Sequence, residues 1–135
     1  MGQRPAPIPL LIVFTLLCVA CSRQPAELKP IQQQRSGDYT VTLLNDTGIL
    51  KQHLDHVRVE FRNASTTELA NVSNVKVQAS MLMPGMGPMF GNLSSPQQIA
   101  PGQYDVNADF GMAGQWNLVI TFDPDGRVQF ALRAQ

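Results

Sequence analysis

Methionine is concentrated in one ten-residue segment, Met81-Leu-Met-Pro-Gly-Met-Gly-Pro-Met-Phe90, which holds four of the six methionines in the chain. Two prolines and two glycines separate the sulfur-bearing side chains, a composition typical of a loop. Thioether sulfur is a soft ligand that suits Cu(I), and it carries no proton that a metal must displace. The segment therefore predicts a loop able to bind a soft metal at a pH where histidine and cysteine ligands are protonated.

The same methionines also have an ordinary structural interpretation. Met81 continues an alternating apolar row and is expected at the end of a core strand, with Met83 as the next inward residue. The earlier members of that row are Val75, Val77 and Ala79. Methionine is a flexible side chain that fills gaps in cores and forms adaptable protein contacts. Metal binding and core packing with an adaptable contact loop both remain open from the sequence.

The two histidines of the chain, His53 and His56, are a second candidate pair of metal ligands. In a strand, residues at this odd spacing face opposite sides, so the two rings converge on one ion only across a bulge or in a turn. The ordinary interpretation is a pair of solvated histidines at a strand edge. We therefore rank both below the methionines as ligands.

Enzymatic motifs are absent from the sequence. No glycine-rich phosphate loop, serine nucleophile elbow or zinc-binding His-Glu-x-x-His motif occurs, and Asp123-Pro-Asp-Gly126 lacks the other spaced oxygen ligands of a calcium loop. Ten basic residues balance ten acidic ones, and no basic stripe suited to nucleic acid is present. We expect a protein that is not an enzyme and does not bind nucleic acid.

The start of the chain has the organisation of an export signal. Residues 10–20 form an apolar run after the single charge of Arg4; the run is short for a bilayer span, which needs about 20 residues, and has the size of a signal-peptide core. Its end, Ala20-Cys21, resembles the cleavage motif of bacterial lipoprotein precursors, although Cys18 stands where leucine is usual. The resemblance implies a signal peptide over residues 1–20 and a lipid on Cys21. The alternatives are a secreted protein cut near Ala20 and an uncut short anchor.

Residues 21–37 are predicted to form a flexible tether. They contain Pro25, Pro30, a run of three glutamines and Ser36-Gly37, with no apolar period. Polar segments that contain proline stay extended and mobile. Such a tether would hold a domain away from a membrane to which Cys21 is anchored, on the extracytoplasmic face of a bacterial cell envelope.

Residues 38–135 are predicted to form one all-β domain, because apolar and polar residues alternate along most of it. The expected strands cover residues 38–44, 56–62, 74–81, 93–99 (broken at Pro96), 104–110, 116–122 and 128–132. Turn signals separate them, the strongest being Asp123-Pro-Asp-Gly126. About seven short strands at this spacing predict an immunoglobulin-like β-sandwich. Both cysteines precede residue 22, so the domain is expected to have no disulfide.

Three segments of this domain resemble the YtkA-like family, which is related to the FixH-like proteins. They are Met83-Pro-Gly-Met-Gly87 after a strand, Pro101-Gly-Gln-Tyr104 at a strand start, and Phe110-Gly-Met-Ala-Gly-Gln-Trp116. The resemblance implies an exported, membrane-tethered β-sandwich linked to copper or heavy-metal handling and to oxidase assembly. The family pattern often has a histidine after the second loop methionine, where this chain has Pro88. A site in this chain would therefore be made of thioethers alone.

The resemblance also implies a further ligand, Met112, between two glycines that let the backbone turn sharply. If the two loops meet at one end of the sandwich, four sulfurs could surround one Cu(I) ion: Met83, Met86, Met89 and Met112. Trp116 would then be a neighbour able to form a cation–π contact, or simply a core tryptophan. Met81, His53 and His56 are the less favoured ligands. The alternative function is a metal-free interaction domain that docks its methionine loop on an envelope partner such as an oxidase or efflux component.

Overall fold

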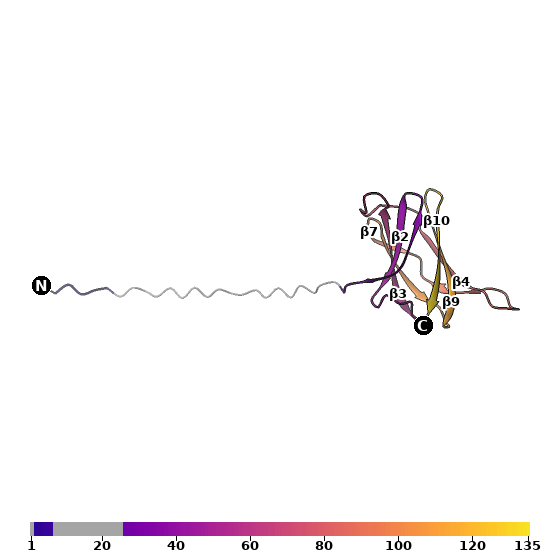
Figure 1. Cartoon of the computed structure of the whole chain (residues 1–135). Helices are drawn as coiled ribbons and strands as arrows, with labels where there is room; N and C mark the ends of the chain where they lie inside the picture. Colours follow the sequence, from indigo (N-terminus) through magenta and orange to yellow (C-terminus); the bar gives the residue numbers. More distant parts are fainter. Residues whose placement is uncertain (1, 7–25) are drawn as a thin grey trace.

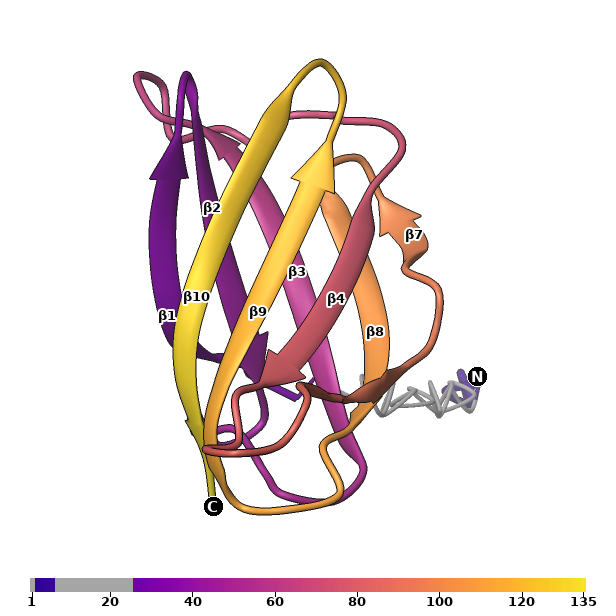
Figure 2. The ribbon, with the colours of Figure 1, turned by 90° about the vertical axis from the view of Figure 1, so that its right-hand side faces the viewer.

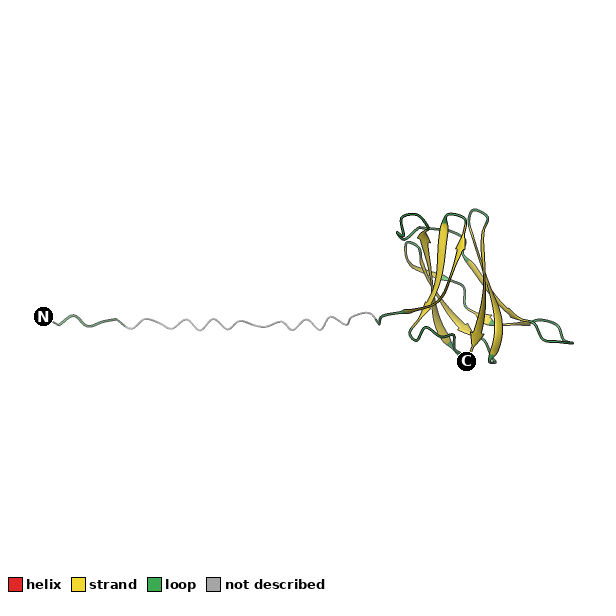
Figure 3. Ribbon diagram, viewed as in Figure 1, coloured by secondary structure: helices red, strands yellow, loops and turns green. Residues whose placement is uncertain are grey.

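The computed structural model describes residues 2–6 and 26–135, and every regular element within them is a β-strand (Figure 3). The predicted signal peptide beyond residue 6, the lipidation residue Cys21 and the first residues of the tether lie outside the described residues. The strands are β1 (Lys29–Ser36), β2 (Tyr39–Asn45), β3 (Asp55–Asn63), β4 (Lys76–Met81), β5 (Met89–Phe90), β6 (Asn92–Leu93), β7 (Gln97–Ala100), β8 (Gln103–Asp109), β9 (Gly114–Phe122) and β10 (Gly126–Ala134). Within the described ranges, no helix is long and apolar enough to cross a bilayer.

The strands form two antiparallel sheets that pack face to face (Figure 2). One sheet has the order β1-β2-β3-β8-β6, with β7 also paired to β8, and the other has the order β10-β9-β4-β5. In immunoglobulin terms, β2, β3, β8 and β6 correspond to strands A, B, E and D, and β4, β9 and β10 to C, F and G. The predicted immunoglobulin-like sandwich is confirmed. Two strands, β1 and β5, were not predicted. The strand predicted over residues 93–99 is divided into β6 and β7 on either side of Pro96.

The predicted tether is wrong over residues 29–36, which form β1. This strand pairs with β2 from Lys29 opposite Asn45 to Ser36 opposite Tyr39, with a register shift after Pro30. β1 is an edge strand, where a proline is tolerated because one flank makes no ladder hydrogen bonds. It needs few apolar residues because none of its side chains is fully buried. The sandwich therefore begins at Lys29 and not at residue 38.

The core lies between the two sheets and is filled by the inward rows of the alternating strands. Its largest fully buried side chains are Trp116, Phe61, Phe110 and Phe130. Several core rings form edge-to-face pairs, including Phe110 with Trp116 at a centroid distance of 5.2 Å and Phe61 with Phe122 at 4.9 Å. Each such buried side chain contributes roughly 1.5–3 kcal/mol, and the described residues contain no cysteine to add a disulfide.

One end of the sandwich, which we call the methionine end, gathers the segments that carry the candidate ligands. β1 begins there and β2 ends there, since Lys29 pairs with Asn45. The C-terminus joins the same end, because the Gln135 N–H donates to the Leu50 carbonyl (3.0 Å), and the Gln52 N–H donates to the Gln135 carbonyl (2.9 Å). The connection between β4 and β5, residues 82–88, leaves this part of the sandwich and projects away from both sheets (Figure 1). We call these residues the methionine arm.

Candidate functional site

A tight turn forms the centre of the methionine arm. The Met86 N–H donates to the Met83 carbonyl at 3.1 Å, and Gly85 has a φ of +75°. Proline at the second turn position and a left-handed glycine at the third define a type II turn, which brings the Cα atoms of its first and fourth residues within about 7 Å. The sequence Met83-Pro-Gly-Met86 therefore places two thioethers at the two ends of one turn.

The outer part of the arm is apolar and exposed. Leu82 and Met86 in the arm are 78 % and 71 % exposed, and Phe90, which follows the arm in β5, is 60 % exposed. Met83 is half-buried and packs against the core. Residues 77–104 contain no charged side chain, so the arm lies in the middle of an uncharged segment. An exposed apolar projection of this kind is uncommon on a soluble domain and is typical of a binding surface.

The base of the arm is formed by Met81 and Met89, which are directly opposite each other in the β4–β5 pair. Met81 is only 8 % exposed and belongs to the core, whereas Met89 is 37 % exposed. Gly114 makes room for Met81: a Cβ atom on Gly114 would lie 2.8 Å from the Met81 Cε and 3.8 Å from its sulfur. Met81 therefore contacts the start of β9 as well as its partner in β5.

Met112 lies in the loop between β8 and β9, next to this base. Its N–H donates to the Phe110 carbonyl at 2.8 Å, and its own carbonyl accepts a hydrogen bond from the Trp116 Nε1–H at 3.1 Å. Met112 is half-buried against the core, and the Trp116 side chain is fully buried. Trp116 is thus a core residue that also holds the Met112 loop in place.

The structure divides the predicted methionine set into two groups. Met83 and Met86 flank the turn of the arm. Met89 joins Met81 at the base, and Met81 reaches Gly114, two residues after Met112. The sequence favours Met81 least among these methionines as a metal ligand, because Met81 continues the inward row of β4 and is expected in the core. It is a core residue, but one at the point where the core meets the arm.

The histidines do not converge. His56 is an exposed residue near the start of β3, where it is opposite Asn107 of β8 and lies beyond the last β2 pair, Leu44 with Arg58. Its Nδ1 lies 2.9 Å from the Asn107 Oδ1 and its Nε2 lies 3.2 Å from Asp105. His53 is exposed in the bend before β3. Within residues 2–6 and 26–135, no three histidine, cysteine, aspartate or glutamate side chains are grouped closely enough to hold a metal ion.

Asp105 is the central acceptor of the polar cluster around His56. The Arg58 Nε donates to its Oδ1 at 2.8 Å, and the Arg58 Nη2 to its Oδ2 at 3.3 Å. Partial burial alone would raise the pKa of Asp105, but the hydrogen bonds and positive charges of Arg58 and then His56 outweigh that effect, and the net result is a lowered pKa. The side chains of His56, Arg58 and Asp105 are therefore paired with one another and with Asn107 near the surface, and none of them is a free metal ligand.

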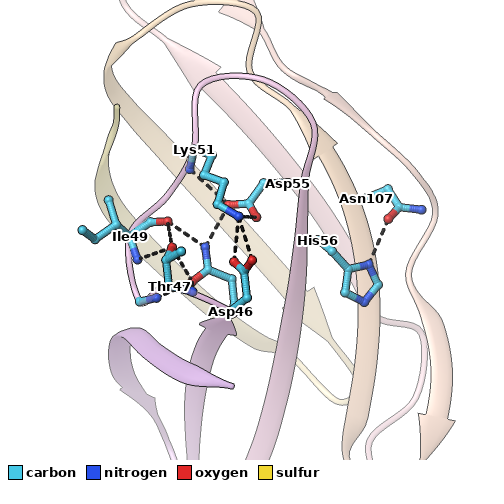
Figure 4. A network of polar contacts seen from close by, with 9 residues as sticks. Asp46, Thr47, Ile49, Lys51, Asp55, His56 and Asn107 are labelled. Atoms are coloured by element: carbon cyan, nitrogen blue, oxygen red, sulfur yellow. Dashed lines mark hydrogen bonds and ion pairs between the residues drawn. The ribbon is translucent and has the colours of Figure 1, made fainter. Parts of the chain in front are cut away.

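Sequence interpretation missed a buried polar pair at the methionine end, Asn45 and Asp55 (Figure 4). The Asn45 amide donates to the Asp55 Oδ2 (2.9 Å) and to the Ile49 carbonyl (2.7 Å). The Lys51 N–H donates to the same carboxylate at 3.1 Å. Asp55 was detectable from the sequence, because it is in phase with the inward row that continues at Val57 and Val59.

These features define a class: an immunoglobulin-like sandwich without a disulfide that carries a methionine-rich arm at one end. A family model described as YtkA-like matches residues 33–121, and the chain belongs to this family. The matched range contains the arm, Met112 and Trp116. No curated protein matches the chain.

Proposed function

We propose that this protein handles a soft metal ion in the bacterial cell envelope, binding Cu(I) through thioether sulfurs at the methionine end and passing the ion on. The observation that carries the proposal is the methionine arm. The arm puts Met83 and Met86 at the two ends of one turn, with Met89 at its base. Met112 occupies the adjoining loop. Soft, neutral donors on an uncharged and exposed segment favour a monovalent soft ion over Zn²⁺ or Cu(II).

A lipid anchor at Cys21 is part of this proposal, and the fold limits how far such an anchor lets the domain move. β1 begins at Lys29, so 29 − 21 leaves eight residue steps, which span at most about 28 Å when fully extended. Since β1 begins at the methionine end, that end would stay within this distance of the bilayer. A Cys21→Ser variant should leave the membrane fraction or remain unprocessed; normal anchoring of the variant would contradict a lipid on Cys21.

A second candidate function is favoured by the exposed residues of the arm that carry no sulfur. Leu82 in the arm and Phe90 just after it in β5 are 78 % and 60 % exposed, yet neither has a side-chain donor atom that can bind a metal. Their exposure supports docking of the arm on a protein partner in the envelope, such as an oxidase or efflux component. Both candidate functions are binding roles, and we propose no catalysed reaction.

The test is a titration of the purified full chain with Cu(I) in the presence of a chelating competitor, at pH 5.5 and pH 7.5. Thioether ligation predicts nearly equal affinities, because none of these ligands competes with a proton. Histidine ligands would lose affinity on acidification, since their unperturbed pKa of about 6.5 lies inside this interval. Absence of binding at both pH values would remove the metal proposal and leave the docking function.

Met86→Leu is the matched variant, because it keeps an apolar side chain of similar volume and removes the sulfur. We expect the variant to melt as the parent does, since such a swap usually costs less than about 1.5 kcal/mol even in a core, and to bind Cu(I) more weakly. Unchanged Cu(I) affinity would show that Met86 is not a ligand.

A further inference from the structure

Methionines from three separate segments border the base of the arm. Met81 and Met89 are opposite each other in an antiparallel pair, so their side chains share one face, with Cβ atoms about 4.5–5.5 Å apart. The third is Met112, whose loop is bound to the same region by the hydrogen bond from Trp116.

Trp116 lies beside this group. The β4–β9 ladder pairs Ala79 with Leu118 and Ser80 with Asn117. The next position in that register places Met81 opposite Trp116, and cross-strand neighbours share a face of the sheet. The contact between Met81 and Gly114 supports the same placement, because Gly114 begins β9 two residues before Trp116. The indole is therefore adjacent to the buried sulfur at the base.

A cation bound among neutral thioethers needs compensation for the water it loses, because burial of an unpaired charge is costly. Residues 77–104 contain no charged side chain to supply it, and the Asp109 carboxylate in the Met112 loop already accepts a hydrogen bond from the Gly111 N–H at 3.0 Å. A tryptophan ring is the best aromatic partner for a cation, and the attraction grows where water is excluded. The base offers three soft donors and an indole, whereas the turn of the arm offers two soft donors, the half-buried Met83 and the exposed Met86.

We propose that the methionine end holds the soft ion at an inner site formed by Met81, Met89 and Met112 beside Trp116, and exchanges it through an outer pair, Met83 and Met86. This inference rests on the proposed function and specifies its ligands. The inner site binds more tightly because it has three donors and a drier environment. The outer pair is the part of the arm that a metal donor or acceptor can reach, because Met86 is the most exposed of the arm's sulfurs.

The experiment uses Ag(I), a soft monovalent ion without redox chemistry under these conditions, and the fluorescence of Trp116, the single tryptophan of the chain. Ag(I) at the inner site should quench Trp116 and saturate at one ion per chain. Met89→Leu and Met112→Leu should each weaken the affinity reported by this signal at least about tenfold, the scale on which loss even of a supporting group affects a metal site. Met81→Leu should do the same if thermal melting shows that it folds.

Met83→Leu is the matched control, because it removes a thioether from the same arm at an outer position. This variant and Met86→Leu should keep the Trp116 signal, lose less affinity than Met89→Leu and Met112→Leu because the inner site retains its three donors, and slow the transfer of Ag(I) to a chelator. If the two outer variants abolish Ag(I) binding while Met89→Leu and Met112→Leu bind as the parent does, the inner site is wrong and the proposed function stands. If the parent binds no Ag(I), the proposed function and the inner site both fail.

Discussion

Two loops at the methionine end of the sandwich differ in how they are held. The polar corner, residues 45–55, is fixed by buried side chains: the Asn45 amide and the Asp55 carboxylate bind each other and the backbone around them (Figure 4). The methionine arm has one internal hydrogen bond, from the Met86 N–H to the Met83 carbonyl. It projects away from both sheets (Figure 1), and its Leu82 and Met86 side chains are exposed.

The difference shows what each residue type does for a loop. Buried amide and carboxylate groups accept only a few arrangements, because each unpaired polar atom is costly, so they select one loop geometry. Thioethers make no comparable demand and adapt to what they contact. The polar corner is therefore a structural element, and the arm is a segment that can change shape around a ligand while its base stays fixed by Met81 and Trp116.

The largest loss of stability is expected from a substitution of Trp116, which lies in the core beside the base of the arm. Trp116→Ala removes a fully buried ring together with its hydrogen bond to Met112, and should lower the free energy of unfolding by about 3–5 kcal/mol. Urea unfolding followed by circular dichroism measures this loss. A loss below about 1 kcal/mol would mean that the base is not held by the core, and the contrast with the polar corner would disappear.

Two glycine substitutions compare the base of the arm with its turn. Gly114 has a φ of +139° and its Cβ position meets Met81, so Gly114→Ala combines backbone strain of about 1–3 kcal/mol with displacement of that side chain. Gly85 has a φ of +75° and nothing near its Cβ position; Gly85→Ala should cost only about 1–2 kcal/mol for the left-handed conformation. Thermal melts of the two variants should rank them in this order, and the reverse order would argue against a packed base.

The polar corner is tested by Asp55→Ala, which leaves the Asn45 amide and the Lys51 N–H without their shared acceptor. An unsatisfied buried donor costs about 1–3 kcal/mol, so the variant should unfold at lower urea concentration. Asp46→Ala is the control, because Asp46 also binds Lys51 but at the surface. Equal losses in the two variants would show that burial does not set the strength of the corner.

The exposed cluster around Asp105 extends the same comparison to polar groups in contact with solvent, where the effect should be smallest. Arg58 and His56 outweigh the effect of partial burial and hold the pKa of Asp105 below its usual value in the folded state, so the stability that this carboxylate contributes is present above the unfolded pKa and is lost as the pH falls through the folded pKa. Asp105→Asn should therefore be less stable than the parent at neutral pH, and the difference should shrink below about pH 4. Melting curves from pH 2.5 to 7 measure it; a constant difference would contradict the ionic origin.

Local pattern was sufficient for the sheets and their inward rows. Val57, Val59 and Phe61 alternate with polar residues, and a strand with one buried face requires that period whatever its partners are. The break at Pro96 and the turn at Asp123-Pro-Asp-Gly126 follow equally from local backbone preferences. The sequence by itself therefore determined the all-β class, most strand positions and the methionine loop, together with the residues by which the chain resembles its family.

Tertiary structure decided what depends on partners distant in the sequence. β1 is a strand because the edge of β2 is available to it, which the composition of residues 29–36 does not reveal. Met81 and Met86 are five residues apart and chemically identical, yet one is 8 % and the other 71 % exposed, because only Met81 lies against β9. Asp55 is tolerated in an inward row because Asn45, from another strand, satisfies it. In each case the environment comes from a neighbouring segment that local periodicity does not specify.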